Sequence, residues 1–424
     1  MSVVRRGGRR VVSGVVAVAL AFGMAALGAS AASAAPAVDI APVPGSPLFP
    51  GEKIEYNGVL YFVAEDESAN AVLYSLNGST ITEVTGGDPA PTDVQLGPVF
   101  GDKLYFSGFN GIERFVYTWD GTTIEEVPGS PIGGSDFVVF GGELLFVGWN
   151  GSEFVWFSWD GAAFTELSSG FALLQPYDPV VYDGTLYFIG YNGTTYVLFS
   201  WDGTTFEEVS GGGDPAPTEV GTPYVHDGVL YLTAYDGVDE ILYTWDGTDF
   251  TDLSGVAPLY PSRFFTFGAD LYFRADDGTD DFLFRFDGTT YTKVVGAAGG
   301  VPAPDDPEHF VAYNGVIYFN ADGEGPSSNT LFSWDGTAFT EYPAPPFDME
   351  DPIVYNGVLY FSAEPTNSDD GREVLYSLRA SAPAPELAAT GADLELALGL
   401  AAIALLGGVT ALVVSRRRPL SLTP

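Results

Sequence analysis

The segment Tyr56-Asn57-Gly58-Val59-Leu60-Tyr61-Phe62 decides the fold, because it joins a tight-turn pair to an apolar strand. The Asn-Gly pair is typical of two-residue hairpin turns, in which both central residues need positive φ. The same pattern recurs at spacings of 44, 40, 42, 44, 41, 46 and 42 residues, beginning at Phe100, Phe140, Tyr182, His226, Phe267, Tyr313 and Tyr355. The chain therefore contains eight copies of one unit.

A second signature marks the end of a later strand in the units. It reads Val116-Tyr117-Thr118-Trp119-Asp120-Gly121 in the second unit and returns at 198–203, 242–247 and 331–336. Each unit then contains four short strands, here called A to D, and no stretch of the domain has helical periodicity. Four strands in about 42 residues is the size of a propeller blade. We expect an all-β domain, a single β-propeller of eight four-stranded blades, over residues 35–380.

Ring closure can also be predicted from the sequence. The eighth unit ends after Leu378 without a strand D. Upstream of the first unit, Val43-Pro44-Gly45-Ser46-Pro47 matches Val127-Pro128-Gly129-Ser130-Pro131, which follows strand D of the second unit. We therefore expect residues 39–43 to supply the missing strand of the last blade.

The units resemble the tandem propeller repeats of bacterial surface proteins that carry the signature E-L-W-x-x-D-G-T. The resemblance covers residues 40–380, through stretches such as Leu198-Phe199-Ser200-Trp201-Asp202-Gly203-Thr204. The Glu of that signature is absent here and the Trp is displaced. The resemblance implies a fold and does not imply an activity.

Residues 1–34 have the three parts of a secretion signal peptide. Four arginines, at positions 5, 6, 9 and 10, precede an apolar run over 15–27. The run is followed by Ala32-Ser33-Ala34, an A-x-A cleavage site. We expect cleavage after Ala34. An uncleaved membrane anchor is the alternative, which the shortness of the apolar run disfavours.

The C-terminal end carries three elements in a fixed order. Leu387-Ala388-Ala389-Thr390-Gly391 follows a Pro/Ala-containing linker at 381–386. An apolar run at 396–414 would be roughly 28 Å long as a helix, enough to span the hydrocarbon of a bilayer. Arg416, Arg417 and Arg418 then form a basic stop. We expect one C-terminal transmembrane helix at 396–414.

In this order, the three elements resemble the substrates of sortases, whose common pattern is L-P-x-T-G. Ala388 stands where that pattern has Pro, which looks like the L-A-x-T-G variant of some high-GC Gram-positive bacteria. The resemblance implies cleavage between Thr390 and Gly391, with sortase and peptidoglycan as partners, so that 387–424 is a cell-wall sorting signal. The alternative is a plain membrane anchor, and either one places the domain outside the cell.

The charge of the domain limits what it can bind. Seven of the 16 basic residues lie in the two ends, whereas only Asp393 and Glu395 of the 56 acidic residues do, so the rest carries a net charge of −45. Such a surface repels phosphate groups, which argues against nucleic acids and anionic membrane surfaces as partners. The chain contains no Cys, so a large apolar core must stabilise the domain without disulfides.

No enzyme signature is present in the chain. Neither a G-x-S-x-G elbow nor a Walker or Rossmann loop occurs, and His226 and His309 are the only histidines. We therefore expect no catalytic site, no cofactor and no enzyme activity, although accidental carboxylate pairs leave a glycosidase open. Asp276, Asp277, Asp280 and Asp281 are the best local candidates for a Ca²⁺ site, because carboxylates are hard oxygen ligands.

Aromatic residues occupy one slot in four consecutive units, just before the turn between strands B and C. They are Phe109, Trp149, Tyr191 and Tyr235. One interpretation is ordinary cross-strand packing. The other is an aromatic rim for a glycan or protein ligand, on the face where the B–C and D–A loops vary in length.

These features predict an exported, cell-wall-anchored surface protein that displays a propeller as a binding module. The ligand would be a glycan or a protein, and we expect a monomer that meets the membrane only through its C-terminal helix before sorting. The alternatives are a wall-linked glycoside hydrolase and a passive surface-coat protein.

Overall fold

The computed structural model describes residues 38–380, except 168–173, 211–216, 254–257, 324–328 and 366–370. Every regular element in these ranges is a β-strand. Within them the structure contains no helix with the length and hydropathy needed to cross a bilayer. The predicted signal peptide, the linker and the sorting signal with its transmembrane helix lie outside the described residues.

Six antiparallel sheets contain four strands each, paired in chain order. The first three are formed by β2 (Lys53–Tyr56), β3 (Val59–Glu65), β4 (Ala71–Asn77) and β5 (Thr80–Glu83); by β6 (Thr92–Phe100), β7 (Lys103–Phe109), β8 (Arg114–Trp119) and β9 (Ile124–Glu126); and by β10 (Ile132–Phe140), β11 (Glu143–Trp149), β12 (Phe154–Trp159) and β13 (Phe164–Glu166). The next three are formed by β14 (Leu174–Tyr182), β15 (Thr185–Tyr191), β16 (Tyr196–Trp201) and β17 (Phe206–Glu208); by β18 (Tyr224–His226), β19 (Val229–Tyr235), β20 (Glu240–Trp245) and β21 (Phe250–Asp252); and by β22 (Leu259–Phe267), β23 (Asp270–Asp276), β24 (Asp281–Phe286) and β25 (Tyr291–Lys293).

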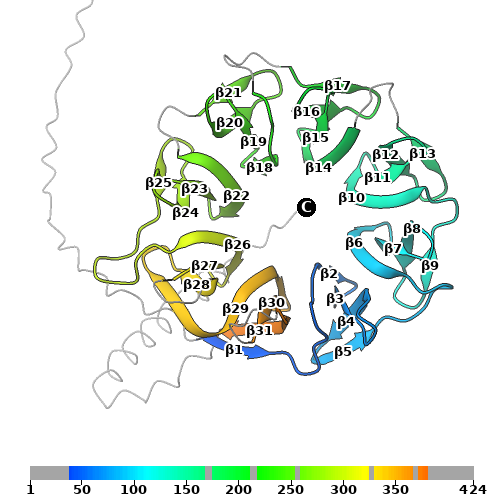
Figure 1. Cartoon of the computed structure of the whole chain (residues 1–424), viewed down its shortest axis with the longest axis horizontal. Helices are drawn as coiled ribbons and strands as arrows, with labels where there is room; N and C mark the ends of the chain where they lie inside the picture. Colours follow the sequence, from blue (N-terminus) through cyan, green and yellow to red (C-terminus); the bar gives the residue numbers. More distant parts are fainter. Residues whose placement is uncertain are drawn as a thin grey trace, which may run out of the picture. The chain divides into compact units, whose positions relative to one another are not determined.

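A seventh sheet joins the remaining seven strands, because its longest strand belongs to two four-stranded units. The strands are β26 (Asp305–Tyr313), β27 (Val316–Asp322), β28 (Thr330–Trp334), β29 (Phe339–Tyr355), β30 (Val358–Glu364), β31 (Val374–Ala380) and β1 (Val38–Pro42). The first residues of β29 pair with β28, and its later residues pair with β30. The described strands thus form eight four-stranded units, numbered here as blades 1 to 8, with the first strand of each facing the centre of a ring (Figure 1). The prediction of an all-β propeller is confirmed.

The N-terminal strand completes the last blade, as the sequence predicts. β1 pairs antiparallel with β31, from Val38 opposite Ala380 to Pro42 opposite Tyr376. The matched Val-Pro-Gly-Ser-Pro segments also make equivalent contacts. The N–H of Val43 donates to the Leu375 carbonyl at 2.7 Å, and the Leu375 N–H donates to Ser46 Oγ at 2.8 Å.

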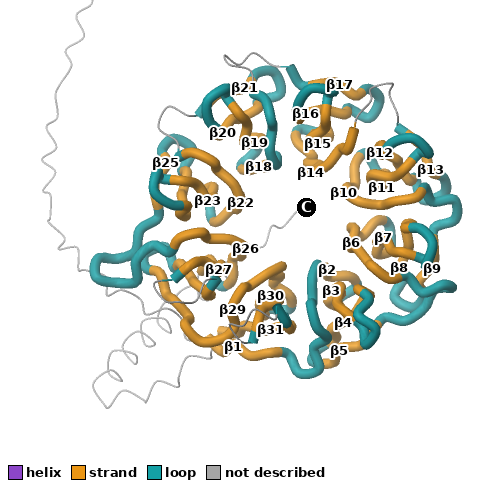
Figure 2. The backbone as a smooth tube through the Cα atoms, viewed as in Figure 1, coloured by secondary structure: helices purple, strands orange, loops and turns teal. Residues whose placement is uncertain are grey.

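In blade 2 the same two bonds join Val127 to the Val116 carbonyl at 2.9 Å and Val116 to Ser130 Oγ at 3.1 Å. The repeated segment therefore fixes the outer strand in the same way in both blades. The tube in Figure 2 follows β1 along the outer edge of blade 8.

Each blade has its core on strand B. A Phe or Leu at the middle of that strand is fully buried in every blade: Phe62, Phe106, Phe146, Phe188, Leu232, Phe273, Phe319 and Phe361. Each such burial stabilises the fold by about 1.5–3 kcal/mol. These apolar centres hold the domain together without disulfides.

Polar side chains connect neighbouring blades at the end of strand A. The hydroxyl of Tyr56 donates to the Asp102 carbonyl at 2.5 Å, and that of Tyr355 donates to the Gly58 carbonyl at 2.6 Å. His226 occupies the same slot, is buried, and contacts Thr266 Oγ1 through Nδ1 at 2.9 Å. The last residue of strand A therefore contributes to the packing between neighbouring blades.

Candidate functional site

The four predicted ligand-face residues lie at one level of the ring. Phe109, Trp149, Tyr191 and Tyr235 are the last residues of strand B in blades 2 to 5, and all four are half-buried. Each lies opposite the first residue of strand C, which is Arg114, Phe154, Tyr196 or Glu240. Only Trp149 and Tyr191 therefore face a second aromatic ring.

Those two pairs combine packing with exposure. The ring centroids of Trp149 and Phe154 are 5.2 Å apart, and those of Tyr191 and Tyr196 are 5.4 Å apart. Phe154 is 44% exposed and Tyr196 is 36% exposed. Cross-strand packing orients the rings and still leaves part of their surface to solvent. We call Trp149, Phe154, Tyr177, Tyr191 and Tyr196 the aromatic arc.

A pocket of about 370 Å³ opens at the end of this arc, between blades 4 and 5. Its walls include Tyr177, Tyr191 and Tyr196, with Glu219 of blade 5 beside them. Tyr177 packs on Tyr196 at a centroid distance of 5.7 Å. Burial raises the pKa of Tyr177, so its hydroxyl stays protonated and can donate a hydrogen bond. We call this the tyrosine pocket.

The turn beside the pocket is held by its own side chain. Asn192 Oδ1 accepts the backbone N–H of Thr194 at 3.0 Å and that of Thr195 at 3.1 Å, and both threonines line the pocket. The same turn follows strand B at Asn110, Asn150 and Asp236. A short local turn thus repeats in blades 2 to 5, because one side-chain oxygen satisfies two backbone donors. The B–C connections of blades 7 and 8 are longer, from Asp322 to Thr330 and from Glu364 to Val374, so these loops do vary around the ring, as expected.

The sequence analysis missed Tyr177, Tyr196 and Glu219. Tyr196 could have been found, since the Asn192-Gly193 turn places it opposite Tyr191. Tyr177 could not, because the inner strand of blade 4 is irregular between Leu174 and Val180, and its side chains do not follow simple alternation. Glu219 could not either, because it lies in the connection between β17 and β18, where no strand pattern reports the direction of a side chain.

A second group of ionisable residues lies between blades 8 and 1. Lys53 donates through Nζ to Ser362 Oγ at 2.7 Å and to the Gly51 carbonyl at 2.8 Å. Burial lowers the pKa of Lys53 to about 8, against the opposing effect of Asp351, Glu373 and Glu350. Burial, followed by the charges of Glu350 and Asp348, raises the pKa of Glu373 to about 7. We call Glu350, Glu364, Glu373 and Lys53 the acidic seam.

Three of the four aspartates proposed for Ca²⁺ are engaged separately, in the contacts that follow. Asp277 accepts Lys293 Nζ at 2.8 Å, whereas Asp281 accepts Arg274 Nε at 2.9 Å. Asp276 Oδ1 accepts the backbone N–H of Gly278 at 2.5 Å. In the part of the chain that the structure describes, no three His, Asp or Glu side chains form a metal-ligand group. The aspartate cluster is thus a set of turn and ion-pair contacts.

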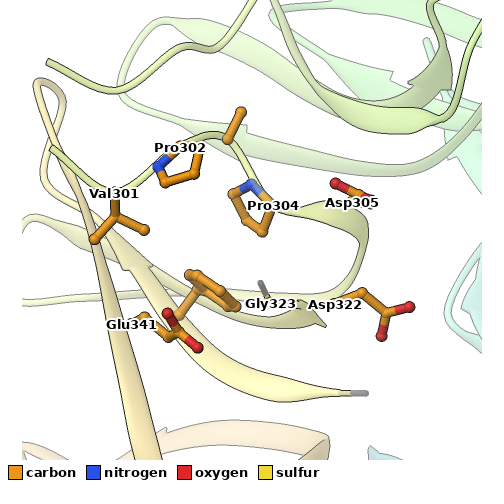
Figure 3. A pocket seen from close by; sticks show the side chains of 9 residues that line it. Val301, Pro302, Pro304, Asp305, Asp322, Gly323 and Glu341 are labelled. Atoms are coloured by element: carbon orange, nitrogen blue, oxygen red, sulfur yellow. The ribbon is translucent and has the colours of Figure 1, made fainter. Parts of the chain in front are cut away.

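A smaller cavity of about 100 Å³ lies where the loop before β26 meets blade 7 (Figure 3). Asp305, Asp322 and Glu341 line it, together with Val301 and Pro304. Burial is the main cause that raises the pKa of Asp305, with the charge of Asp280 next. The volume of this cavity is below the roughly 300–1,000 Å³ of usual ligand pockets. The tyrosine pocket is the better candidate.

Comparison with known proteins assigns no family to the chain. No family model matches the chain, and no curated protein matches it. The chain is similar to a puromycin-hydrolyzing peptidase of Mycobacterium tuberculosis, with 14% identity and a TM-score of 0.48. That match covers 75% of this chain and 58% of the peptidase, so the chain spans little more than half of it.

Two archaeal structures are similar over the same domain. The propeller domain of the Trilobed protease from Pyrococcus furiosus matches with 13% identity and a TM-score of 0.43, covering 70% of this chain and 99% of that domain. Acylaminoacyl peptidase of Pyrococcus horikoshii matches with 10% identity and a TM-score of 0.42, and the match covers 76% of this chain and 59% of the peptidase.

These neighbours correct one expectation of the sequence analysis. The chain was expected not to be an enzyme, because no catalytic motif was found. The three solved structures named above are peptidases or a domain of one. The exclusion of enzyme activity is withdrawn, and a shared fold by itself assigns no reaction.

Proposed function

We propose that the propeller is a glycan-binding module, exported and held at the cell surface, and that the aromatic arc with the tyrosine pocket is its ligand site. The observation that carries the proposal is the pocket of about 370 Å³ in which three tyrosines stand beside two threonines and Glu219. Aromatic faces cover the apolar faces of sugar rings, while hydroxyl and carboxylate groups bond their hydroxyls. The test must also distinguish a glycan ligand from a protein ligand.

Export and anchoring are proposed from the sequence. Arg5 to Ala34 support secretion, while the L-A-A-T-G motif at 387–391, the apolar run and the three arginines after it support attachment to peptidoglycan by a sortase. Cell fractionation checks this part. Thr390→Ala should move the protein from the wall fraction to the membrane fraction, and an unchanged distribution would argue for a plain membrane anchor.

The binding proposal is tested on a glycan array with the purified full-length protein. The double variant Trp149→Ala/Tyr191→Ala should lose retention at least about 10-fold, since each stacked ring contributes about 1 kcal/mol or more. Tyr235→Ala is the matched control, because Tyr235 lies in the same slot of blade 5 but faces Glu240 and does not line the pocket. Equal retention by the double variant and the control would refute the proposal.

A second candidate function is glycoside hydrolysis at the acidic seam. The favouring observation is a pair of neighbouring carboxyls, of which Glu373 has its pKa raised to about 7 and Glu350 has its pKa raised by burial. An acid of raised pKa beside a second carboxyl is the arrangement of glycosidases. Shortened products from the bound oligosaccharides, lost in Glu373→Gln, would establish hydrolysis.

A further inference from the structure

A larger pocket of about 600 Å³ lies on the other side of the same segment of blade 5. Glu219 and Val220 line the tyrosine pocket, and the next two residues, Gly221 and Thr222, line this second pocket. Consecutive Cα atoms are about 3.8 Å apart. The two pockets are therefore neighbours, and one extended ligand can reach both.

The second pocket contains two arginines of blade 6. Arg263 and Arg274 line it, with Glu240 and Glu308. Only nine basic residues belong to the strongly acidic part of the chain between the two ends, so two of them in one pocket is a local enrichment of positive charge, although Glu240 and Glu308 balance it. We call this the arginine pocket.

Arg274 is held in place by carboxylates on three sides. It donates to Asp281, to Glu308 Oε1 at 2.6 Å through NH1, and to Asp306 Oδ1 at 2.7 Å through NH2. Its side chain is 21% exposed. Its charge is offset within the protein, so Arg274 fixes Glu308 and shapes the wall of the pocket.

Arg263 differs from Arg274 in its contacts. Its side chain is 54% exposed, and its contact with Glu308 Oε1 is long, at 3.4 Å. A guanidinium carries five N–H donors in a planar fork that matches a carboxylate. Arg263 can therefore donate to an anionic group that enters the pocket.

The backbone at Arg263 adopts an uncommon conformation. Its φ is +54°, in the left-handed region. At the same position of strand A, Asp136, Asp178 and Asp351 adopt this conformation in other blades, and aspartate tolerates it better than arginine does. Arg263 has no such local advantage, and His309 adopts the same conformation at this position of blade 7.

We propose that the arginine pocket binds the carboxylate of an acidic saccharide, with Arg263 as the residue that selects it. The inference rests on the proposed function, because the neutral part of the same saccharide would lie in the tyrosine pocket. Thr222 and Glu240 supply polar groups for its hydroxyls. A carboxylate at this place would pair with the one arginine of the pocket that remains half-exposed.

The test is calorimetry of the full-length protein with two probes, tetragalacturonate and its methyl ester, which share the sugar backbone and differ in that each carboxylate is replaced by an uncharged methyl ester. The charged probe should bind about 10-fold more tightly, because a charge-assisted hydrogen bond contributes more than a neutral one. Arg263→Asn should remove that preference and leave the methyl ester bound as before. Because asparagine tolerates a positive φ, the melting temperature should stay equal or rise.

The possible results separate the two proposals. Equal binding of both probes by the wild-type protein would overturn the acidic-saccharide site, and so would an unchanged preference in Arg263→Asn. The proposed glycan-binding function would still stand in either case if neutral glycans bound in a tyrosine-dependent way. A preference that depends on Arg263 and survives Tyr191→Ala would support the arginine pocket and refute the tyrosine pocket. If neither probe bound to the wild-type protein, the inference would be overturned.

Discussion

The seam between blades 4 and 5 and the seam between blades 8 and 1 share a backbone plan and differ in chemistry. Strand C of the earlier blade accepts a backbone N–H of the next blade in both, from Val220 to the Tyr196 carbonyl at 3.2 Å and from Phe49 to the Glu373 carbonyl at 3.1 Å. One residue or two later, a glycine N–H bonds to strand B, from Gly221 and from Gly51, each at 2.8 Å.

The side chains at equivalent positions of the two seams are opposite in kind. Three tyrosines in blade 4 correspond to three glutamates in blade 8: Tyr177 to Glu350, Tyr191 to Glu364, and Tyr196 to Glu373. The tyrosines form an open pocket, whereas Glu350 and Glu373 act electrostatically on the buried ammonium of Lys53, together with Asp351.

The comparison teaches that backbone bonds and buried strand-B residues maintain the propeller, while the seam positions are free to vary. A seam can then become an aromatic site or a charged one without a change in fold. Three substitutions test this separation.

The largest effect is expected when a glutamate is placed in the tyrosine seam. Tyr196→Glu removes two ring contacts and brings a carboxylate against Tyr177 and Tyr191, which should reduce the free energy of unfolding by about 3 kcal/mol at pH 8. Urea denaturation measures it. The loss should shrink at pH 4, where the new carboxyl is protonated. Tyr196→Gln is the control, because it removes the same two ring contacts without adding a charge, and a similar loss in both variants would show that only the ring contacts matter.

A smaller effect is expected at the two glycines. A Cβ on Gly221 would lie 2.2 Å from Thr233 Oγ1, whereas one on Gly51 would have only Asp351 Oδ2, at 3.9 Å, nearby. Gly221→Ala should therefore lower the free energy of unfolding by about 2 kcal/mol, and Gly51→Ala by less than about 0.5 kcal/mol. Thr233→Ala in the Gly221→Ala background should recover part of the loss. Equal effects at both glycines would contradict the difference between the seams.

The smallest effect concerns the pH dependence of the acidic seam. The pKa of Glu373 is raised in the folded protein, so the folded state binds more protons than the unfolded state between pH 4.5 and about 7, and stability falls as pH rises through this window. Because Glu373 is half-exposed, we expect about 1–2 kcal/mol after solvent screening. Denaturation midpoints of the wild-type protein and Glu373→Gln should converge at low pH and separate above pH 7.

The measurement should end below pH 8, because Lys53 acts in the opposite direction above it. Its pKa is lowered to about 8, so the unfolded state binds more protons between pH 8 and 10.5 and stability rises there. Parallel pH profiles for the wild-type protein and Glu373→Gln would refute the raised pKa of Glu373.

The repeat could be predicted from the sequence because its signals are local. Asn57-Gly58 specifies a turn with positive φ at both residues, and Asn57 has φ of +51° and Gly58 of +73° in the structure. The closing strand could be predicted because Val43 to Pro47 copies a segment elsewhere in the chain. Two of the five residues of the aromatic arc, Trp149 and Tyr191, could be predicted for the same reason, since they occupy a slot that recurs along the units.

The rest of the site depends on register and on neighbours from other blades. Tyr177 and Arg263 lie on inner strands whose bulges change which side a residue faces, and no pattern of period two reports a bulge. The aspartates near residue 280 show the opposite: residues that are close in sequence do not form a common site. They are adjacent in sequence, but Arg274 and Lys293 engage two of them separately.

The sequence by itself determined the number of units, their four-strand pattern and the closing strand, because turns and alternation are properties of neighbouring residues. Only the tertiary structure decided that Tyr177, Tyr196 and Glu219 share one pocket and that Arg263 keeps an exposed guanidinium. The physical reason is that a site between blades is made by residues some 20 to 50 positions apart, and only the packing of one blade on the next brings their side chains together.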